Sequence, residues 1–379
     1  MFKGKFNDIV LKDEGFLRGP FGSALKKSLF VPKSVDAYKV YEQSVVLEKN
    51  KNLGEYYISK EYFESKLKNF EVKRGDFLVS CSGVNYGEIY ELEGKIEKGV
   101  INQALLRVRI NEKIIDRNYF LYYFRAYIAK VITGGSGDST IPNFPPMDFV
   151  KNVEVELPDL VIQRKIGRIL KRIDKKYELN NQINNNLEEL AYMIFLKKFT
   201  QKIPNGAIGE IIKENEKSKI KVSDAKTVKG KYPFFTSGES ILEWNDYLVE
   251  GRNLFFNTGG NADVKYYVGK AMYSTDTWCV TTNGDFSDYL YLYFKSIRGE
   301  LDRKFFHGSG LKHLQKDLLK QEKIYIPEKE EISQFNILVK PMFDTISANK
   351  IESQRLNSLK EFILPLLMNG QINVDDIEI

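Results

Sequence analysis

The chain has 379 residues, a formal net charge of +6, 42% hydrophobic and 13% aromatic residues. This length and composition predict two ordinary domains with cores of their own and exclude a disordered chain. No stretch approaches the roughly 20 consecutive apolar residues of a membrane span, and the start lacks the apolar core of a signal peptide, so we expect a cytoplasmic protein without a membrane partner. The positive charge favours a polyanionic partner without specifying one.

The first part of the chain, over residues 1–158, is predicted to be a mixed α/β domain. Short apolar runs such as "FLVSCSG" (77–83) and "ALLRVRI" (104–110) are separated by Gly, Asn and Ser, which indicates strands and turns. The segment "YFLYYFRAYIAKVI" (119–132) is the clearest helix.

Residues 159–199 form a predicted spacer helix, because apolar residues step by three or four through this segment. About 38 helical residues would reach roughly 57 Å, which is longer than a core helix of a small domain. Asn180 and Asn184 fall where apolar residues are expected. They either fix the register against a second helix or mark a solvated bend or break between two shorter helices.

The second half repeats this order. Strand-and-turn patterns return over residues 200–328, and residues 329–379 form a second predicted spacer helix, in which Pro341 predicts a kink or a restart. We expect the two helices to pair antiparallel as a coiled coil, with their line of contact, the seam, formed by four leucines. These are Leu187, Leu190, Leu356 and Leu359.

Matching segments indicate an internal duplication. "GDFLVSCSG" (75–83) matches "GRNLFFNTG" (251–259), and "VELP" (155–158) matches "IYIP" (324–327), each about 170 positions later. The tripeptide "GSG" also occurs in both halves, at 135–137 and 308–310. Two similar domains with two similar helices predict a pseudo-twofold molecule, which suits the near-twofold symmetry of a DNA duplex.

Five segments carry a family resemblance. They are "LRGPFGSALKKSLF" (17–30), "KRGDFLVSCSG" (73–83), "INQALLRVRI" (101–110), "VELPDLVIQRKIGRIL" (155–170) and "LLMNGQINV" (366–374). Together they resemble the specificity (S) subunit of bacterial and archaeal type I restriction-modification systems. "KYPFFTSG" (231–238) and "KYYVGKAMYSTDTWCV" (265–280) look like a second target-recognition domain of that family.

The resemblance implies a subunit that is not an enzyme, has no catalytic residues, and reads double-stranded DNA. Residues 1–158 and 200–328 would be target-recognition domains, one for each half of a bipartite target, and the helices at 159–199 and 329–379 would be conserved spacers. The helices would dock two adenine-N6 methyltransferase (M) subunits, and restriction/translocase (R) subunits would join them. S-adenosylmethionine, ATP and Mg²⁺ would serve those partner subunits, so this chain would need no cofactor. Because the domains differ at their starts, we expect two unlike half-sites.

Catalytic alternatives have only near matches. "FHGSG" (306–310) follows a charged stretch and not the apolar strand that a cofactor-binding turn should end, and "NFPPM" (143–147) interposes Phe144 in the loop that would grip an adenine. Asp76 with "EGK" (93–95) loosely imitates a nuclease set, which solvated turn charges also explain.

Other classes of site are weaker still. Two cysteines and two histidines are too sparse for a zinc site, so we expect no metal site. A coiled-coil scaffold joining two protein-binding domains is the remaining alternative, but the predicted loops carry lysines among Gly, Ser, Thr and Tyr, which suits phosphates and base edges better.

The predicted DNA contacts lie in glycine-rich loops with lysine, amide and hydroxyl side chains. In the first domain they are Arg18, Ser23, Lys26, Lys27, Ser82, Asn85, Tyr86, Ser136, Ser139, Thr140 and Asn143. In the second they are Thr236, Ser237, Thr258, Asn261, Lys265, Tyr266, His307, Ser309, Lys312 and His313. Each glycine turn also fits a role in chain reversal alone, and the amides of Asn102 and Gln103 fit either base contacts or local backbone bonds.

Overall fold

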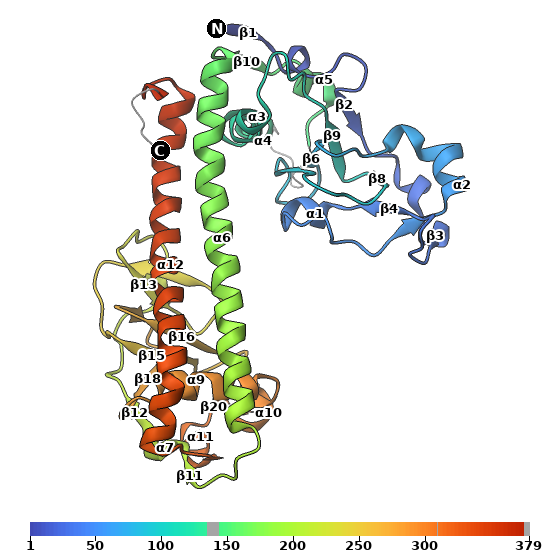
Figure 1. Cartoon of the computed structure of the whole chain (residues 1–379). Helices are drawn as coiled ribbons and strands as arrows, with labels where there is room; N and C mark the ends of the chain where they lie inside the picture. The colour runs from blue at the N-terminus through green and yellow to red at the C-terminus, as the bar shows by residue number, and fades with distance from the viewer. Residues whose placement is uncertain (135–143, 309, 375–379) are drawn as a thin grey trace. The chain divides into compact units, whose positions relative to one another are not determined.

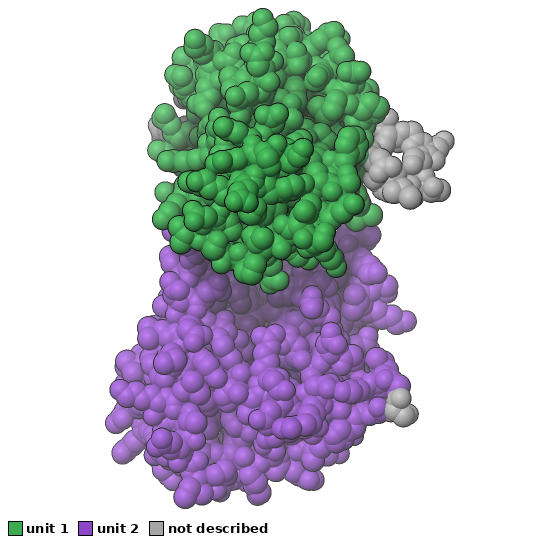
Figure 2. All heavy atoms as spheres, turned by 90° about the vertical axis from the view of Figure 1, so that its right-hand side faces the viewer, with its two compact units in different colours: residues 1–175, 357–379 green, residues 176–356 purple. Residues whose placement is uncertain are grey.

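The computed structural model describes residues 1–134, 144–308 and 310–374 (Figure 1). The chain forms two compact units, coloured separately in Figure 2. Unit 1 comprises Met1–Lys175 and Asn357–Ile379, and unit 2 comprises Lys176–Leu356. Five of the predicted DNA contacts lie outside the described residues, namely Ser136, Ser139, Thr140, Asn143 and Ser309.

The described residues of unit 1 form two four-stranded sheets and one two-stranded sheet. The first sheet is antiparallel, in the order β2 (Phe16–Arg18), β9 (Leu105–Val108), β6 (Phe77–Ser80) and β7 (Ile89–Glu91). The second is in the order β3 (Phe30–Val31), β5 (Tyr57–Ile58), β4 (Tyr38–Tyr41) and β8 (Gly99–Ile101). The third pairs β1 (Phe2–Lys5) with β10 (Glu154–Leu157).

Unit 2 is built from similar sheets. Its antiparallel sheet is in the order β12 (Ile212–Glu214), β18 (Thr277–Thr282), β15 (Arg252–Asn257) and β16 (Val264–Val268). A second sheet is in the order β14 (Ile241–Trp244), β13 (Tyr232–Phe235) and β17 (Met272–Tyr273). Two further pairs are β11 (Gly206–Ala207) with β21 (Lys323–Ile324), and β19 (Phe306–His307) with β20 (His313–Leu314).

The connectivity of the two units confirms the predicted duplication. In each unit, the strands of the first sheet described above occur in the same relative chain order, first, fourth, second and third. In the second sheet of each unit, β4 pairs antiparallel with β5 and parallel with β8, and β13 pairs in the same way with β14 and β17. Two domains with one topology therefore stand in one chain.

Aromatic helices fill both cores. The helix predicted at 119–132 is observed as α3 (Arg117–Tyr123), one wider helical turn, and α4 (Ala129–Gly134), and it buries Phe120 against Phe77. In unit 2, α9 (Ser287–Ser296) buries Phe294 against Phe256. The remaining short helices are α1 (Gln43–Leu47), α2 (Lys60–Tyr62), α5 (Met147–Lys151), α7 (Ile208–Ile211), α8 (Val222–Ala225), α10 (Leu301–Phe305) and α11 (Lys316–Gln321).

The two predicted long helices are α6 (Leu160–Phe199) and α12 (Lys329–Met368), and both are continuous. Of the two outcomes predicted at Pro341, the restart is therefore wrong, and the kink stays a prediction. Pro341 and Ile337 are both exposed, so the carbonyl group that loses its helical donor faces water, where it can bond to solvent.

Each long helix is tied to the domain that it packs against by one buried amide side chain. In unit 1, Gln163 of α6 accepts from the Asp116 amide (2.8 Å) and donates to the Ile114 carbonyl (3.1 Å) before α3. In unit 2, Asn336 of α12 donates to the Asp285 carbonyl (2.7 Å) before α9. In both halves, an amide side chain of the long helix thus bonds to the loop before the aromatic helix of the domain.

The seam between the long helices is polar in unit 2. The buried Asn180 donates to Glu352 Oε2 (2.7 Å), and Asn184 accepts from Asn349 Nδ2 (2.9 Å). Residue numbers fall along α12 as they rise along α6, so the two segments are antiparallel. This confirms that the asparagines contact a second helix, and the bend or break is excluded by the unbroken α6.

Two of the predicted seam leucines lie elsewhere. Leu190 is 49% exposed and Leu359 is 47% exposed, whereas Leu187 packs partly buried against the core of unit 2 and Leu356 is half-buried. The buried face of α6 in unit 2 carries Ala191 instead, and Leu190 points about 100° around the helix from it. The prediction is thus wrong for Leu190 and Leu359.

These neighbours on α6 provide a matched pair of variants. Leu187→Asp places a charge against the core and should lower the free energy of unfolding by about 2 kcal/mol or more, while Leu190→Asp should change it by less than about 0.5 kcal/mol. Urea unfolding of the whole chain, followed by circular dichroism, measures the difference. Equal losses in the two variants would contradict the observed faces of α6.

Candidate nucleic-acid interface

Arg18, at the end of β2, joins three predicted segments of unit 1. Its Nε donates to the Gln103 carbonyl (3.1 Å), its Nη2 donates to the Cys81 carbonyl (3.4 Å), and its guanidinium lies 5.5 Å from the ring centre of Phe144. We call residues 18–27, 81–87 and 102–104 the first loop cluster. Segments far apart in the sequence therefore meet at one place.

The loop after β2 lies close against Asn102 and Gln103. A Cβ atom on Gly19 would lie 1.7 Å from the Asn102 carbonyl oxygen, so the approach requires glycine. Ala24 and Leu25 pack on the core, which leaves the exposed Ser23, Lys26 and Lys27 in solvent. A groove of about 230 Å³ is lined, among others, by Gly22, Lys27, Glu42, Asn102 and Gln103.

The second loop of this cluster is a tight turn after β6. Gly83 has a φ of +70°, and the Tyr86 amide donates to its carbonyl (3.2 Å). Ser82 donates to Gln43 Oε1 (2.9 Å), and Gln43 donates back to the Ser82 carbonyl, so Gln43 is a positioning residue that sequence reasoning missed. Asn85 is exposed. Tyr86 is buried and donates to the Thr133 carbonyl (3.0 Å), so its predicted DNA contact is wrong.

Unit 2 assembles its predicted segments in a corresponding way. The Thr258 amide donates to Ser237 Oγ (3.3 Å), the Leu314 amide to the Thr258 carbonyl (3.0 Å), and the Gly260 amide to the Lys312 carbonyl (3.2 Å). We call residues 236–240, 257–263 and the described part of 307–314 the second loop cluster. Its exposed predicted residues are Asn261, His307, Lys312 and His313, and its half-buried ones are Ser237 and Thr258.

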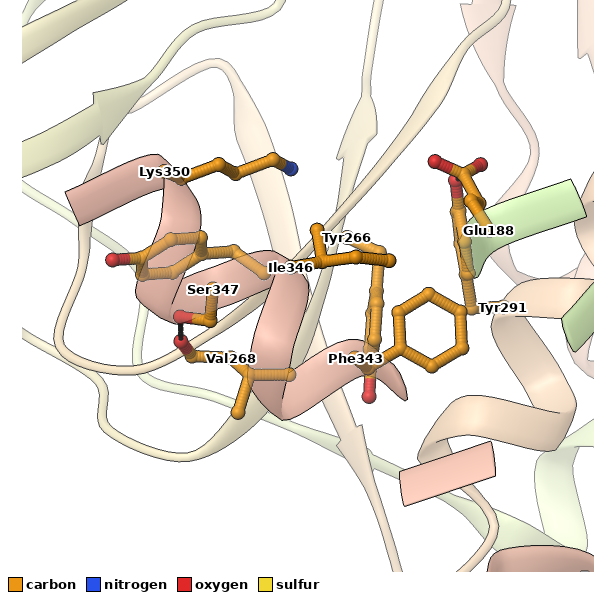
Figure 3. A pocket seen from close by; sticks show the side chains of 9 residues that line it. Glu188, Tyr266, Val268, Tyr291, Phe343, Ile346, Ser347 and Lys350 are labelled. Atoms are coloured by element: carbon orange, nitrogen blue, oxygen red, sulfur yellow. Dashed lines mark hydrogen bonds between the residues drawn. The ribbon is translucent and has the colours of Figure 1, made fainter. Parts of the chain in front are cut away.

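Tyr266 is not part of this surface. Its ring stacks on Tyr291 at 4.7 Å, and its hydroxyl donates to Asp288 Oδ1 (2.6 Å). Burial raises the pKa of Tyr266 well above its ordinary value. With Phe343 it lines a small pocket of about 20 Å³ (Figure 3). The predicted DNA contact of Tyr266 is wrong, because β16 turns this side chain into the core.

Thr236 and Lys265 support the second loop cluster from within. Thr236 is buried and its hydroxyl donates to the Ser240 carbonyl (2.7 Å). Lys265 Nζ donates to the Thr236 carbonyl (3.1 Å) and to Asn257 Oδ1 (3.0 Å), and burial lowers the pKa of Lys265. Both were predicted to contact DNA, and both instead hold the loop backbone in place.

The two clusters share a scaffold and differ in side chains. The Asn102 amide donates to the Tyr41 carbonyl (3.0 Å) in unit 1, and the Ser274 amide donates to the Phe235 carbonyl (2.9 Å) in unit 2. These backbone bonds join corresponding strand ends, β8 to β4 and β17 to β13. The two clusters are thus built on the same backbone pattern, with Asn102 in unit 1 where unit 2 has Ser274.

The charges of the clusters also differ. Among the residues that the structure describes, Lys26 and Lys27 form no ion pair, whereas Lys312 pairs with Asp302. Unpaired exposed lysines suit phosphate contacts.

Within the described ranges, no three His, Cys, Asp or Glu side chains are grouped to hold a metal ion. No helix in that part of the chain is long and apolar enough to cross a membrane.

A larger hollow of unit 1 lies apart from the first loop cluster. It has a volume of about 660 Å³, and its lining includes Tyr123, Leu157, Ile162 and Leu367. No residue of the first loop cluster lines it, so its size does not mark the predicted DNA contacts.

The sequence is similar to known proteins over most of its length. The sequence matches the family described as "Type I restriction modification DNA specificity domain" over residues 21–189 and 201–361. It is 24% identical to the type I restriction enzyme MjaVIII specificity subunit of Methanocaldococcus jannaschii, over 93% of this chain and 90% of that protein. The MjaIX specificity subunit of the same organism is 20% identical over 73% of each chain.

A solved structure has the same fold. The crystal structure of the S subunit of a type I restriction-modification system from M. genitalium matches with a TM-score of 0.64 and 14% sequence identity. The match covers 97% of this chain and 95% of that one.

The exposed lysines of the first loop cluster give a test of phosphate contact. Replacing Lys26 and Lys27 with alanine should weaken binding of the assembled complex to all DNA duplexes alike. It should also reduce the slope of log affinity against log salt concentration by about one unit per lost phosphate contact. Lys12 and Lys113 are exposed lysines near the other end of β9, and the double alanine variant at these positions is the control. Binding isotherms at several salt concentrations measure both; unchanged affinity of the Lys26/Lys27 variant at low salt would contradict the assignment.

Proposed function

The chain belongs to the family of type I restriction-modification DNA specificity subunits, and from this membership we propose that it reads a bipartite DNA target with one domain per half-site. The observation that carries the proposal is the pair of loop clusters, each formed by segments brought together on the same strand topology. Each cluster offers exposed lysine, amide and hydroxyl groups, which are the groups that contact phosphates and base edges.

The two half-sites differ in sequence, in this proposal, because corresponding positions carry different side chains. Gln43, which bonds to the 82–87 turn in unit 1, is matched by Ser237, which bonds to Thr258 in unit 2. Val84 directly follows the Gly83 turn, and the matching position after Gly259 is Gly260. A palindromic target would need two similar surfaces, so these differences support an asymmetric one.

The paired helices dock two adenine-N6 methyltransferase subunits. Leu179, Ile183, Leu190 and Met193 of α6 are exposed and spaced four, seven and three residues apart, which places them on one face. This face is distinct from the seam face that carries Asn180 and Asn184. An exposed apolar stripe of this kind is typical of a surface that a protein partner covers.

Catalysis belongs to partner subunits. The methyltransferase subunits would use S-adenosylmethionine, and restriction/translocase subunits would use ATP and Mg²⁺, while this chain acts without a cofactor. In support, Phe306 and His307 of the near-match "FHGSG" lie in β19, which pairs antiparallel with β20. This local pairing is that of a hairpin and not of a strand leading through a glycine-rich turn into a helix.

An exchange of the first domain tests the division of the target. Replacing residues 1–158 with the corresponding domain of another specificity subunit should change one half of the methylated sequence and leave the other half and the gap unchanged. The methylated sequence is read from cells that express the exchanged chain with its methyltransferase. A change in both halves would contradict independent domains.

A charge on the apolar stripe tests the docking surface. Ile183→Asp should reduce co-purification with the methyltransferase subunit at least tenfold, because a carboxylate would be buried unpaired in the contact. Asn185→Asp adds the same charge to α6 two residues away, on another face, and should leave co-purification unchanged. Similar behaviour of the two variants, with both folded, would contradict this use of the stripe.

A further inference from the structure

Two large apolar side chains stand almost fully in solvent on the first loop cluster. Phe21 is 89% exposed and Val84 is 84% exposed. Exposure alone does not mark a contact, because single exposed apolar residues are common and Val35 of the same unit is 101% exposed. What distinguishes Phe21 and Val84 is their position on two anchored loops beside candidate DNA contacts.

The loop that carries Phe21 is fixed on both sides. The preceding Pro20 is buried, and the Phe21 carbonyl accepts from the Ala24 amide (2.9 Å). Tyr62 donates to the Ala24 carbonyl (3.0 Å), which holds this short turn on the core. The exposed Phe21 ring therefore projects from a turn that is held by hydrogen bonds, and it would lose little conformational entropy on binding.

The turn that carries Val84 is fixed in a similar way. The Gly87 amide donates to the Ser80 carbonyl (2.8 Å), and the Cys81 amide to the Ala104 carbonyl (2.8 Å). Gln43 bonds to Ser82 on one side, and the buried Tyr86 closes the turn on the other. Val84 is exposed between them, with Gly83 and Asn85 on either side.

The surroundings of these two side chains suit DNA. Arg18 links their loops, because it bonds to the Cys81 carbonyl before Val84 and to the Gln103 carbonyl, and the Gln103 side chain lies against Gly22, next to Phe21. Lys26 and Lys27 follow Phe21 in the same loop. Exposed apolar side chains can contact base edges on the floor of a DNA groove, and the lysines beside them can contact the phosphates along its sides.

We propose that Phe21 and Val84 are specificity-determining residues that contact thymine C5-methyl groups in the major groove of the first half-site. The inference rests on the proposed function: adenine methylation in that half-site requires an A·T pair, and hence a thymine. The thymine methyl is the apolar group that the major groove exposes, and phenyl and small aliphatic side chains pack on it. In unit 2 the position of Val84 is held by Gly260, which has no side chain to make the Val84 contact.

The test replaces thymine by uracil, which lacks only the methyl group, at one position at a time in a synthetic duplex. The duplex carries the sequence that the wild-type complex methylates, and binding is measured for the complex of the whole chain with its methyltransferase. Wild type should lose about four- to tenfold in affinity at the contacted positions of the first half-site. Phe21→Ala and Val84→Ala should each bind thymine and uracil equally at one of these positions.

Val35→Ala is the matched control, because it removes the same two methyl groups as Val84→Ala from another exposed valine of unit 1. It should respond to uracil as wild type does. Equal responses of Phe21→Ala, Val84→Ala and wild type, or no sensitive thymine in wild type, would overturn the inference while leaving the proposed function intact. Loss of co-purification with the methyltransferase in Phe21→Ala or Val84→Ala would overturn it in favour of a protein contact. A wild-type complex that prefers no sequence would overturn the proposed function as well.

Discussion

The polar contact between α6 and α12 is the constraint on which the helical part of the structure depends. An amide group buried without a partner costs free energy, so the buried Asn180 and Asn184 favour the one register that brings them opposite Glu352 and Asn349. A purely apolar seam would tolerate a slip of one heptad. In unit 1, an ion pair between Asp174 and Lys360 follows the same antiparallel order.

The loop clusters show how one scaffold carries two surfaces. The bonds that bring the segments together end largely on backbone groups, such as the carbonyls of Cys81 and Gln103 in unit 1 and those of Thr258 and Lys312 in unit 2. Backbone groups are present whatever the side chain is. Exposed positions such as Val84 and Gly260 can therefore differ while the anchoring pattern is kept.

Periodicity and repetition made much of the fold predictable. The three-to-four spacing of apolar residues indicated both long helices, and the matched segments indicated two domains of one topology. The individual seam residues were less predictable, because a helix with apolar residues on two faces does not disclose which face is covered. Leu190 and Leu359 fell on the exposed side for this reason.

The loops that form the candidate site were predictable from the sequence, whereas the roles of individual side chains were less predictable. Arg18, Lys26, Lys27 and Asn85 occupy the first loop cluster as expected. Lys265 and Tyr266 were misassigned, because a lysine that holds backbone and a tyrosine turned inward have the same local sequence context as surface residues. Gln43 was missed, since its role depends on a turn almost 40 positions away.

The central claim is that one chain directs modification to a two-part sequence. The most direct measurement is a map of N6-methyladenine in DNA from cells that express this chain with the methyltransferase of its own system. The account predicts a split motif of two unlike halves around a fixed gap, absent from cells that express the methyltransferase alone. Methylation at a continuous or palindromic sequence, or methylation that is the same without this chain, would contradict it.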